Sequence, residues 1–289
     1  MEAAKHSLND AIHYPAADFE PAISELAEWL NQGINDRTLK SRLLLGNGAS
    51  EILDLITSMA PKGGFKGVLQ VQYREYQRAS EAHGRPILAF NDPNPAAILT
   101  IINPNNPTGT YWPIESLKRL IIERAVPKSV VMVDESMLPW LGPHWKSESL
   151  LSQRDWIQQL FLKSGIEIFI IHSWTKIWAC PGIRLGSVVC PTEAQCKAMK
   201  KRQVPWSLNC AALAFLTEVV HDEEYLLKTW ELTPQWRAAM CDFFAREFPV
   251  WKVFGESWTS WIWVDVGEEA VAKKMSNDAV EDDFVVIGA

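Results

Sequence analysis

The chain has 289 residues, of which 47% are hydrophobic and 22% charged, so it can bury a full core as a large domain with a smaller one. The formal net charge is −7, which disfavours broad binding to nucleic acid or to an anionic membrane surface. No apolar run approaches the roughly 20 residues of a membrane helix, and the N-terminus lacks the apolar core of a signal peptide.

The five cysteines form no CxxC pair and are odd in number, so we expect them to be reduced, as in a cytoplasmic protein. The histidines are scattered without metal-ligand spacing, so no metal site is expected. The 14 tryptophans are expected to fill the core and interfaces.

Apolar residues at helical spacing predict helices over 21–30 and 50–59. Apolar strands then alternate with helices: strands over 68–71, 97–102, 130–133, 168–171 and 185–190, and helices over 73–82, 114–124 and 156–163. This alternation predicts an α/β fold with a mostly parallel sheet covered by helices on both faces.

From about Pro205 the pattern changes to long helices over 208–221 and 223–246, followed by short strands over 252–254 and 260–266. We therefore expect two domains, a large one over 1–204 with a short N-terminal arm and a small α+β one over 205–289.

Three polar residues follow three of the predicted strands: Asn106, Asp134 and Lys176. Ligands of open α/β sheets bind beyond the carboxyl ends of the strands. Lys176 comes soon after a buried strand, where it is well placed for covalent chemistry. Ser173 lies three residues before it and Arg184 eight residues after it, and both side chains suit a phosphate. Together these residues suggest a pyridoxal-phosphate site with Lys176 as the Schiff-base lysine.

The glycine-containing run at 46–51 leads into a predicted helix whose first turn includes Ala49 and Ser50. The free amides of a helix N-terminus bind anions, and capping of the helix by Ser50 explains the same run equally well. The run is neither a Walker loop nor a complete dinucleotide fingerprint.

Four motifs in order resemble those of the class I/II (fold type I) pyridoxal-phosphate-dependent aminotransferases. They are NPNNPTG at 103–109, Asp134-Glu135, SWTK at 173–176 and PGIRLG at 181–186. The resemblance extends from about Tyr14 to Val266 and implies a seven-stranded type of sheet. QYREYQRA at 72–79 and PWSLN at 205–209 resemble the branch of histidinol-phosphate aminotransferases and threonine-phosphate decarboxylases, especially the latter.

The resemblance implies a role for each residue around the cofactor ring. Lys176 would form the Schiff base and move the Cα proton of the substrate. Asp134 would pair with the pyridinium nitrogen, so that the ring acts as an electron sink. Asn106 would donate to the ring O3′, and Tyr73 would stack on the ring face.

The resemblance also implies a phosphate site formed by Ser173, Arg184 and the amides of Ala49 and Ser50. Tyr14, in His13-Tyr14-Pro15, resembles the tyrosine that reaches the phosphate of the neighbouring subunit, which implies a homodimer with shared sites.

The sequence departs from the family in three ways. Met137 stands where the family usually has a tyrosine or phenylalanine three residues after the aspartate, which leaves O3′ more dependent on Asn106. The family usually begins some tens of residues before the HYP motif. No arginine follows Arg246, so the arginine that grips the substrate carboxylate has no candidate in its expected place, and we expect a shortened small domain.

Three functions remain open. The first is transfer of an amino group from an amino acid or an amino-acid phosphate to a 2-oxo acid. The second is decarboxylation of an amino-acid phosphate in the same fold. The third is a shortened, non-catalytic protein that binds the cofactor or a partner, which the ends of the chain favour and the complete set of Lys176, Asp134, Asn106 and Arg184 opposes.

Overall fold

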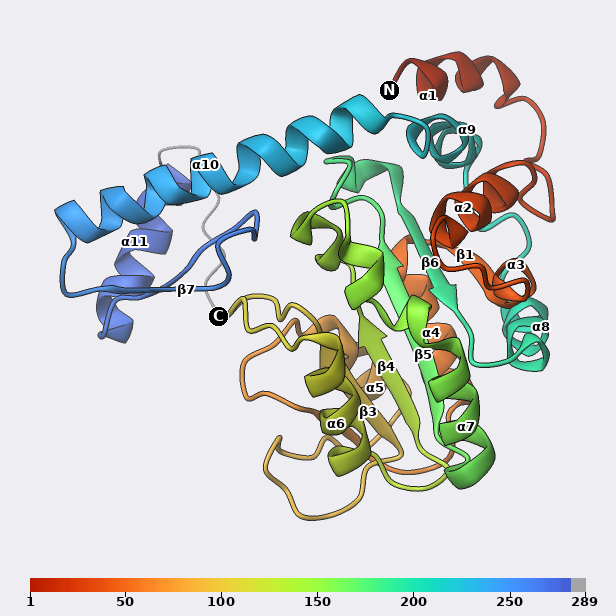
Figure 1. Ribbon diagram of the computed structural model, residues 1–289, viewed down its shortest axis with the longest axis horizontal. Coiled ribbons are helices and arrows are strands. Elements are labelled where there is room, and N and C mark those ends of the chain that lie inside the picture. The colour runs from red at the N-terminus through yellow and green to blue at the C-terminus, as the bar shows by residue number, and fades with distance from the viewer. Residues whose placement is uncertain (282–289) are drawn as a thin grey trace.

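A six-stranded sheet forms the centre of the computed structural model, which describes residues 1–281 (Figure 1). Its strands lie in the order β1 (Leu43–Asn47), β6 (Leu185–Val189), β5 (Glu167–Ser173), β4 (Val130–Asp134), β3 (Ile98–Ile102) and β2 (Phe65–Gly67). Only β6 runs antiparallel to its neighbours. The predicted α/β class with a mostly parallel sheet is confirmed, with six strands in the described residues where the resemblance implies seven.

Helices cover both faces of this sheet, because its strands are buried on both sides. One face carries α4 (Gly48–Met59), α5 (Glu75–Ala82) and α8 (Glu193–Arg202), and the other carries α2 (Ala22–Asn31), α6 (Ile114–Arg124), α7 (Arg154–Ser164) and α9 (Cys210–Val219). Alternate residues of a strand join opposite cores: Val131 and Val133 face α6 and α7, whereas Val130 and Met132 face α4 and α5. By the same alternation, Asp134 points toward the α4–α5 face.

The remaining α-helices and strands precede β1 or follow α9. They are α1 (Glu2–His6), α3 (Leu39–Arg42), α10 (Glu223–Glu247), β7 (Lys252–Phe254), β8 (Trp263–Asp265) and α11 (Glu269–Glu281). Figure 1 shows α10 extending past the edge of the sheet, with β7 and α11 beside its far half. Residues 282–289, the end of the predicted small domain, lie outside the described residues.

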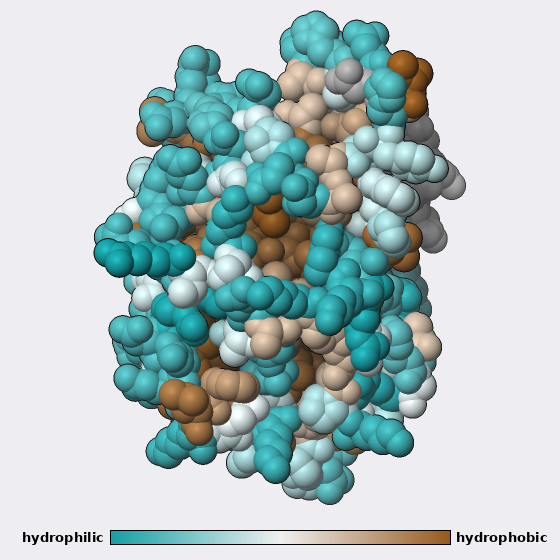
Figure 2. Space-filling view, turned by 90° about the vertical axis from the view of Figure 1, so that its right-hand side faces the viewer, coloured by the Kyte–Doolittle hydropathy of each residue, from teal (hydrophilic) through white to brown (hydrophobic). Residues whose placement is uncertain are grey.

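Local side-chain caps set the start of the later helices. Thr192, Asn209 and Asp222 precede α8, α9 and α10, and each accepts a hydrogen bond from a first-turn amide. None of the described helices is long and apolar enough to cross a membrane. The face that lies to the right in Figure 1 is mostly hydrophilic, with hydrophobic atoms visible in hollows between polar side chains (Figure 2).

One strand prediction is wrong. The apolar run at 68–71 was expected to be a strand, but the strand is β2, three residues earlier. Val68 is buried in the core without being part of the strand, because the chain bends after Gly67. Hydrophobicity alone does not separate a core contact from a ladder position.

A cluster in the core beneath α2 and α7 contains four tryptophans, each at most 7% exposed: Trp29, Trp145, Trp174 and Trp178. The rings of Trp174 and Trp178 both lie 5.5 Å from that of Trp29. The expectation that tryptophans fill the core is confirmed for this cluster. The five cysteines are free thiols, as expected, and Cys180, Cys190 and Cys196 are buried.

Candidate active site

The carboxyl ends of β3, β4 and β5 lie side by side at one edge of the sheet. The Asn103 amide donates to the carbonyl of Asp134 at 2.8 Å, and the Glu135 amide donates to the carbonyl of Ile171 at 2.9 Å. These bonds hold the loop over 103–109, the end of β4 and the turn after β5 along a common edge. Asp134 therefore ends the middle one of three adjacent strands, and Asn106 and Lys176 follow the strands on either side of it.

Lys176 lies in a tight turn that follows β5. Its amide donates to the carbonyl of Ser173 at 3.3 Å, and the Ala179 amide donates to the carbonyl of Lys176 at 3.0 Å. The Ser173 and Thr175 hydroxyls lie 2.9 Å apart. The lysine is exposed, and in residues 1–281 its Nζ has no hydrogen bond or ion pair. The amine is therefore not engaged by another side chain of these residues.

Arg184 lies against the N-terminus of α4. A Cβ added to Gly48, whose φ is +72°, would lie 2.4 Å from Nη2 of Arg184. A Cβ added to Gly186 would lie 2.6 Å from the amide nitrogen of Ala49. Only glycine admits such close approach, so the two glycines bring the guanidinium and the helix end together.

The first turn of α4 keeps its amides available. The N-cap residue is Asn47, whose side chain makes no capping bond, and its own amide donates to Oε2 of Glu51 at 2.7 Å. Ser50 does not cap the helix, so that interpretation of the run is wrong. Ser173 pairs with Gly186 on the adjacent strand, which brings its hydroxyl to the same corner. We call this group, Gly48, Ala49, Ser50, Ser173 and Arg184, the anion cradle, because it combines a cation with a helix N-terminus.

Asp134 is a buried carboxylate, 8% exposed, with two neutral donors. Its Oδ2 accepts a hydrogen bond from the Tyr76 hydroxyl at 2.7 Å, and its Oδ1 accepts one from the Ser136 amide at 2.8 Å. Among residues 1–281 no lysine, arginine or histidine forms an ion pair with it. A buried carboxylate is costly unless it meets a positive charge, so this site suits a cationic N–H donor.

Tyr73 lies near Asp134, and Asn106 belongs to the loop that follows the adjacent strand β3. Burial raises the pKa of the Tyr73 phenol. The negative charges of Glu75 and Asp134 raise it further, and the positive charges of Arg184 and Arg78 oppose this. Nδ2 of Asn105 donates to the carbonyl of Val71 at 3.0 Å, which ties the Asn106 loop to the segment before Tyr73. In the described residues the Asn106 side chain has no hydrogen bond.

Two positions refine the sequence-based view. Met137 is half-buried and packs against the core, so it brings no polar group to the site. Tyr76, which sequence reasoning did not single out, reaches Asp134 from α5. Its signal was the spacing of Tyr76 and Ala79, which lie three residues apart in α5 and share its buried face.

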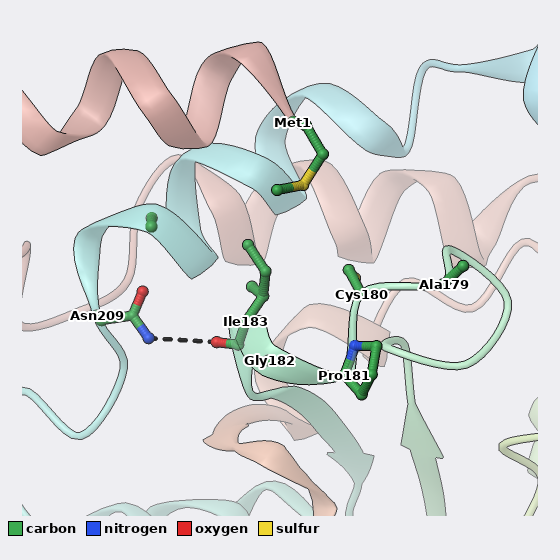
Figure 3. A pocket seen from close by; sticks show the side chains of 8 residues that line it. Met1, Ala179, Cys180, Pro181, Gly182, Ile183 and Asn209 are labelled. Carbon is green, nitrogen blue, oxygen red and sulfur yellow. Dashed lines mark hydrogen bonds between the residues drawn. The ribbon is translucent and has the colours of Figure 1, made fainter. Parts of the chain in front are cut away.

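The loop between Lys176 and Arg184 forms one wall of a pocket, lined also by Met1 and Asn209 (Figure 3). Nδ2 of Asn209 donates to the carbonyl of Ile183 at 3.2 Å, while its Oδ1 caps α9. The PWSLN stretch thus holds the residue before Arg184. Arg184 itself has a φ of +62°, so its left-handed backbone is maintained by such contacts.

The chain after α9 touches the site through the Asn106 loop. Nε1 of Trp261 donates to the carbonyl of Pro107 at 2.7 Å, and a Cβ on Gly109 would lie 2.4 Å from Cα of Gly255. Arg237, 8% exposed, donates to the carbonyls of Phe254 and Gly255 at 2.8 and 2.9 Å. This buried arginine is therefore engaged with the backbone.

Tyr14 lies apart from these residues. It is 79% exposed, and its ring stacks on Trp206 of the same chain at 4.6 Å. Within one chain, the structure brings together the cradle, Asp134, Tyr73 and the Lys176 turn, and it leaves Tyr14 on the surface.

Two curated relatives illustrate the range of similar sequences. Histidinol-phosphate aminotransferase of Hyphomonas neptunium is 27% identical over 84% of this chain and 66% of its own length. Threonine-phosphate decarboxylase of Salmonella typhimurium is 26% identical over 75% of this chain and 59% of its own length. The chain therefore spans less than two thirds of these relatives.

A solved structure shares the fold. Histidinol-phosphate aminotransferase of Sinorhizobium meliloti, in complex with pyridoxal-5′-phosphate, has a TM-score of 0.79 and 18% identity, and the match covers all of this chain and 78% of that one. The sequence profile described as aminotransferase class I and II matches residues 1–287. By that match, which takes in nearly the whole sequence, this chain belongs to the class I and II aminotransferase family.

Proposed function

We propose that the chain is a pyridoxal-phosphate-dependent aminotransferase that acts on an amino acid or an amino-acid phosphate. One observation carries the proposal: the anion cradle and the buried Asp134 carboxylate flank the turn of a free lysine. Arg184 leads into β6 and Asp134 ends β4, and β5, which leads to Lys176, lies between them. An anion site and a cation site on either side of an amine fit a cofactor with a phosphate and a basic ring nitrogen.

Each part of this group has a separate task. Arg184 and the Ala49 and Ser50 amides would hold the phosphate, with the Ser173 hydroxyl beside them. Asp134 would accept the ring N–H. When bound, pyridoxal phosphate supplies an electron sink for the charge that develops at the substrate Cα.

The remaining tasks fall to the ring contacts and the lysine. Asn106, whose amide has no other partner in the described residues, would donate to O3′. Tyr73 would cover the ring face. Lys176 would hold the cofactor covalently through Nζ and then move the proton at the substrate Cα.

The proposal extends to the assembly and the setting of the protein. Tyr14 would reach the phosphate of a second copy in a homodimer, and its 79% exposure supports its availability for that contact. The proposed protein has two parts, a cofactor-binding domain over 1–204 and a small domain over 205–289. We also propose that the protein is cytoplasmic and acts in amino-acid metabolism.

Decarboxylation of an amino-acid phosphate is the second candidate. The role of Asn209, within the PWSLN stretch, in holding Ile183 supports it, because that stretch resembles the decarboxylase branch. A panel of amino acids and their phosphates, scored for keto acid against carbon dioxide, separates the two reactions. Binding of cofactor without either product from any donor would favour a non-catalytic protein.

Covalent trapping tests the proposal. Purified protein with pyridoxal phosphate is expected to show a visible absorbance, and borohydride is expected to fix the cofactor on the peptide that contains Lys176. Lys176→Ala should abolish both signals. Lys197→Ala is the control, because that lysine is exposed and pairs only with Glu193 at 2.6 Å. Equal trapping in wild type and Lys176→Ala would refute the proposed function.

A further inference from the structure

Tyr76 joins α5 to the end of β4 by a hydrogen bond inside the protein. The residue is 2% exposed, and its hydroxyl donates to Oδ2 of Asp134 at 2.7 Å. Burial, followed by the charge of Asp134 and the hydrogen bond to it, raises the pKa of the phenol well above its usual value. The phenol therefore keeps its proton and acts only as a donor toward the carboxylate.

The Asp134 carboxylate depends on donors of this kind. Its other oxygen accepts the Ser136 amide at 2.8 Å, and the Ser136 hydroxyl in turn accepts the Ser173 amide at 2.7 Å. Each carboxylate oxygen has two acceptor positions, so both oxygens retain capacity for one more donor. Hydrogen bonds to the charged form of an acid favour that form.

A proton between Asp134 and a ring nitrogen can rest on either group. In a site shielded from water, the neutral pair of carboxylic acid and pyridine competes with the ionic pair of carboxylate and pyridinium, because an isolated charge is costly there. A third group that donates to the carboxylate stabilises the ionic pair. Tyr76 is placed to do this without touching the cofactor.

We propose that Tyr76 is a positioning residue that keeps the proton on the cofactor's ring nitrogen by holding Asp134 as a carboxylate. This inference rests on the proposed function. It assigns control of the ring's electron demand to Tyr76, a residue of the QYREYQRA stretch for which the resemblance implies no role. The phenol also fixes the carboxylate's rotation, since Tyr76 and Ser136 bind different oxygens.

The test is the ring-nitrogen chemical shift of bound pyridoxal phosphate labelled with nitrogen-15, measured on the holoenzyme. Tyr76→Phe keeps the ring that packs against the α4–α5 core and removes only the hydroxyl. Loss of one hydrogen bond to a charged group should lower the ratio of nitrogen-protonated to carboxyl-protonated pairs about tenfold or more. The signal should move from the wild-type position toward that of Asp134→Asn.

A matched control removes a phenol donor elsewhere. The Tyr111 hydroxyl donates to Oε2 of Glu148 at 3.0 Å. Tyr111→Phe is expected to leave the nitrogen signal at the wild-type position. An unchanged signal in Tyr76→Phe, or an equal shift in both variants, would overturn the inference.

Fluorotyrosine at position 76 keeps the test decisive if the phenylalanine variant folds poorly. Its more acidic phenol is a stronger donor, so the signal should move away from that of Asp134→Asn. A shift in the other direction would contradict the assigned role. Failure of wild type to bind or trap the cofactor would instead refute the proposed function, so the two failures are distinguishable.

Discussion

Gly48→Ala tests the anion cradle, because the new methyl group would occupy the place of the guanidinium. The added Cβ would lie 2.4 Å from Nη2 and 2.9 Å from Cζ of Arg184. The atoms in conflict are at the end of a flexible side chain, so the guanidinium would move and the backbone would stay. A positive φ of +72° adds a strain of about 1–2 kcal/mol for a residue other than glycine.

The magnitude follows from the contact that is lost. A hydrogen bond to a charged group contributes about 1.5–3 kcal/mol, so displacement of Arg184 should weaken pyridoxal-phosphate binding about ten- to a hundredfold. Pyridoxal lacks the phosphate, and its binding should change little. The assay is the dissociation constant of both compounds, measured by absorbance or fluorescence on the same preparation.

Gly33→Ala is the matched control. Gly33 also has a positive φ, +81°, but a Cβ there would meet nothing within 4 Å. It should show the same backbone strain in thermal unfolding and no loss of cofactor affinity. Equal weakening of pyridoxal and pyridoxal phosphate by Gly48→Ala would refute the reasoning, as would equal effects of the two glycine variants.

Two further predictions concern stability. Burial raises the pKa of Glu135 to about 7, so its contribution to stability is complete below its ordinary value of 4.5 and is lost as the pH rises to 7. The free energy of unfolding of Glu135→Gln should therefore rise by about 3 kcal/mol relative to that of wild type between pH 4.5 and 8. Urea unfolding measures this difference, and a difference that does not change with pH would contradict the prediction. Asp36→Asn would leave the guanidinium of Arg42, which is 4% exposed, without its charged partner, at a cost of about 3–5 kcal/mol. The exposed ion pair of Glu269 and Lys273 provides the comparison, because Glu269→Gln should cost less than about 1 kcal/mol of stability. Equal melting temperatures of the two variants would exclude the argument from burial of the Asp36 pair.

Regular periodicity was enough to locate several elements. The helix predicted over 114–124 coincides with α6, and the strand predicted over 252–254 coincides with β7. β1 was missed because its short apolar run precedes a glycine-containing segment, and pairing with β6 is what defines it as a strand. α8 was missed because it is mostly polar, with only Cys196 and Met199 buried.

The candidate site was predictable in its residues but not in its contacts. Ordered motifs identified Lys176, Asp134 and Arg184, and the strand order explains why they come together. The approach of Arg184 to Gly48 depends on β6 lying next to β1, which no local pattern encodes. Tyr76 was overlooked because its role arises only when α5 packs over the end of β4. The chemical roles of all these residues remain predictions.

The link between Trp261 and Pro107 bears on how this chain could be redesigned. Replacement of the segment after α9 by another segment would sever the bond to the Asn106 loop unless Trp261 is kept. Gly255 must also be kept, because its φ is +100° and a Cβ there would lie 3.2 Å from Nη2 of Arg237. A chimaera that preserves Trp261, Gly255 and the Arg237 contacts is expected to retain the support of the Asn106 loop.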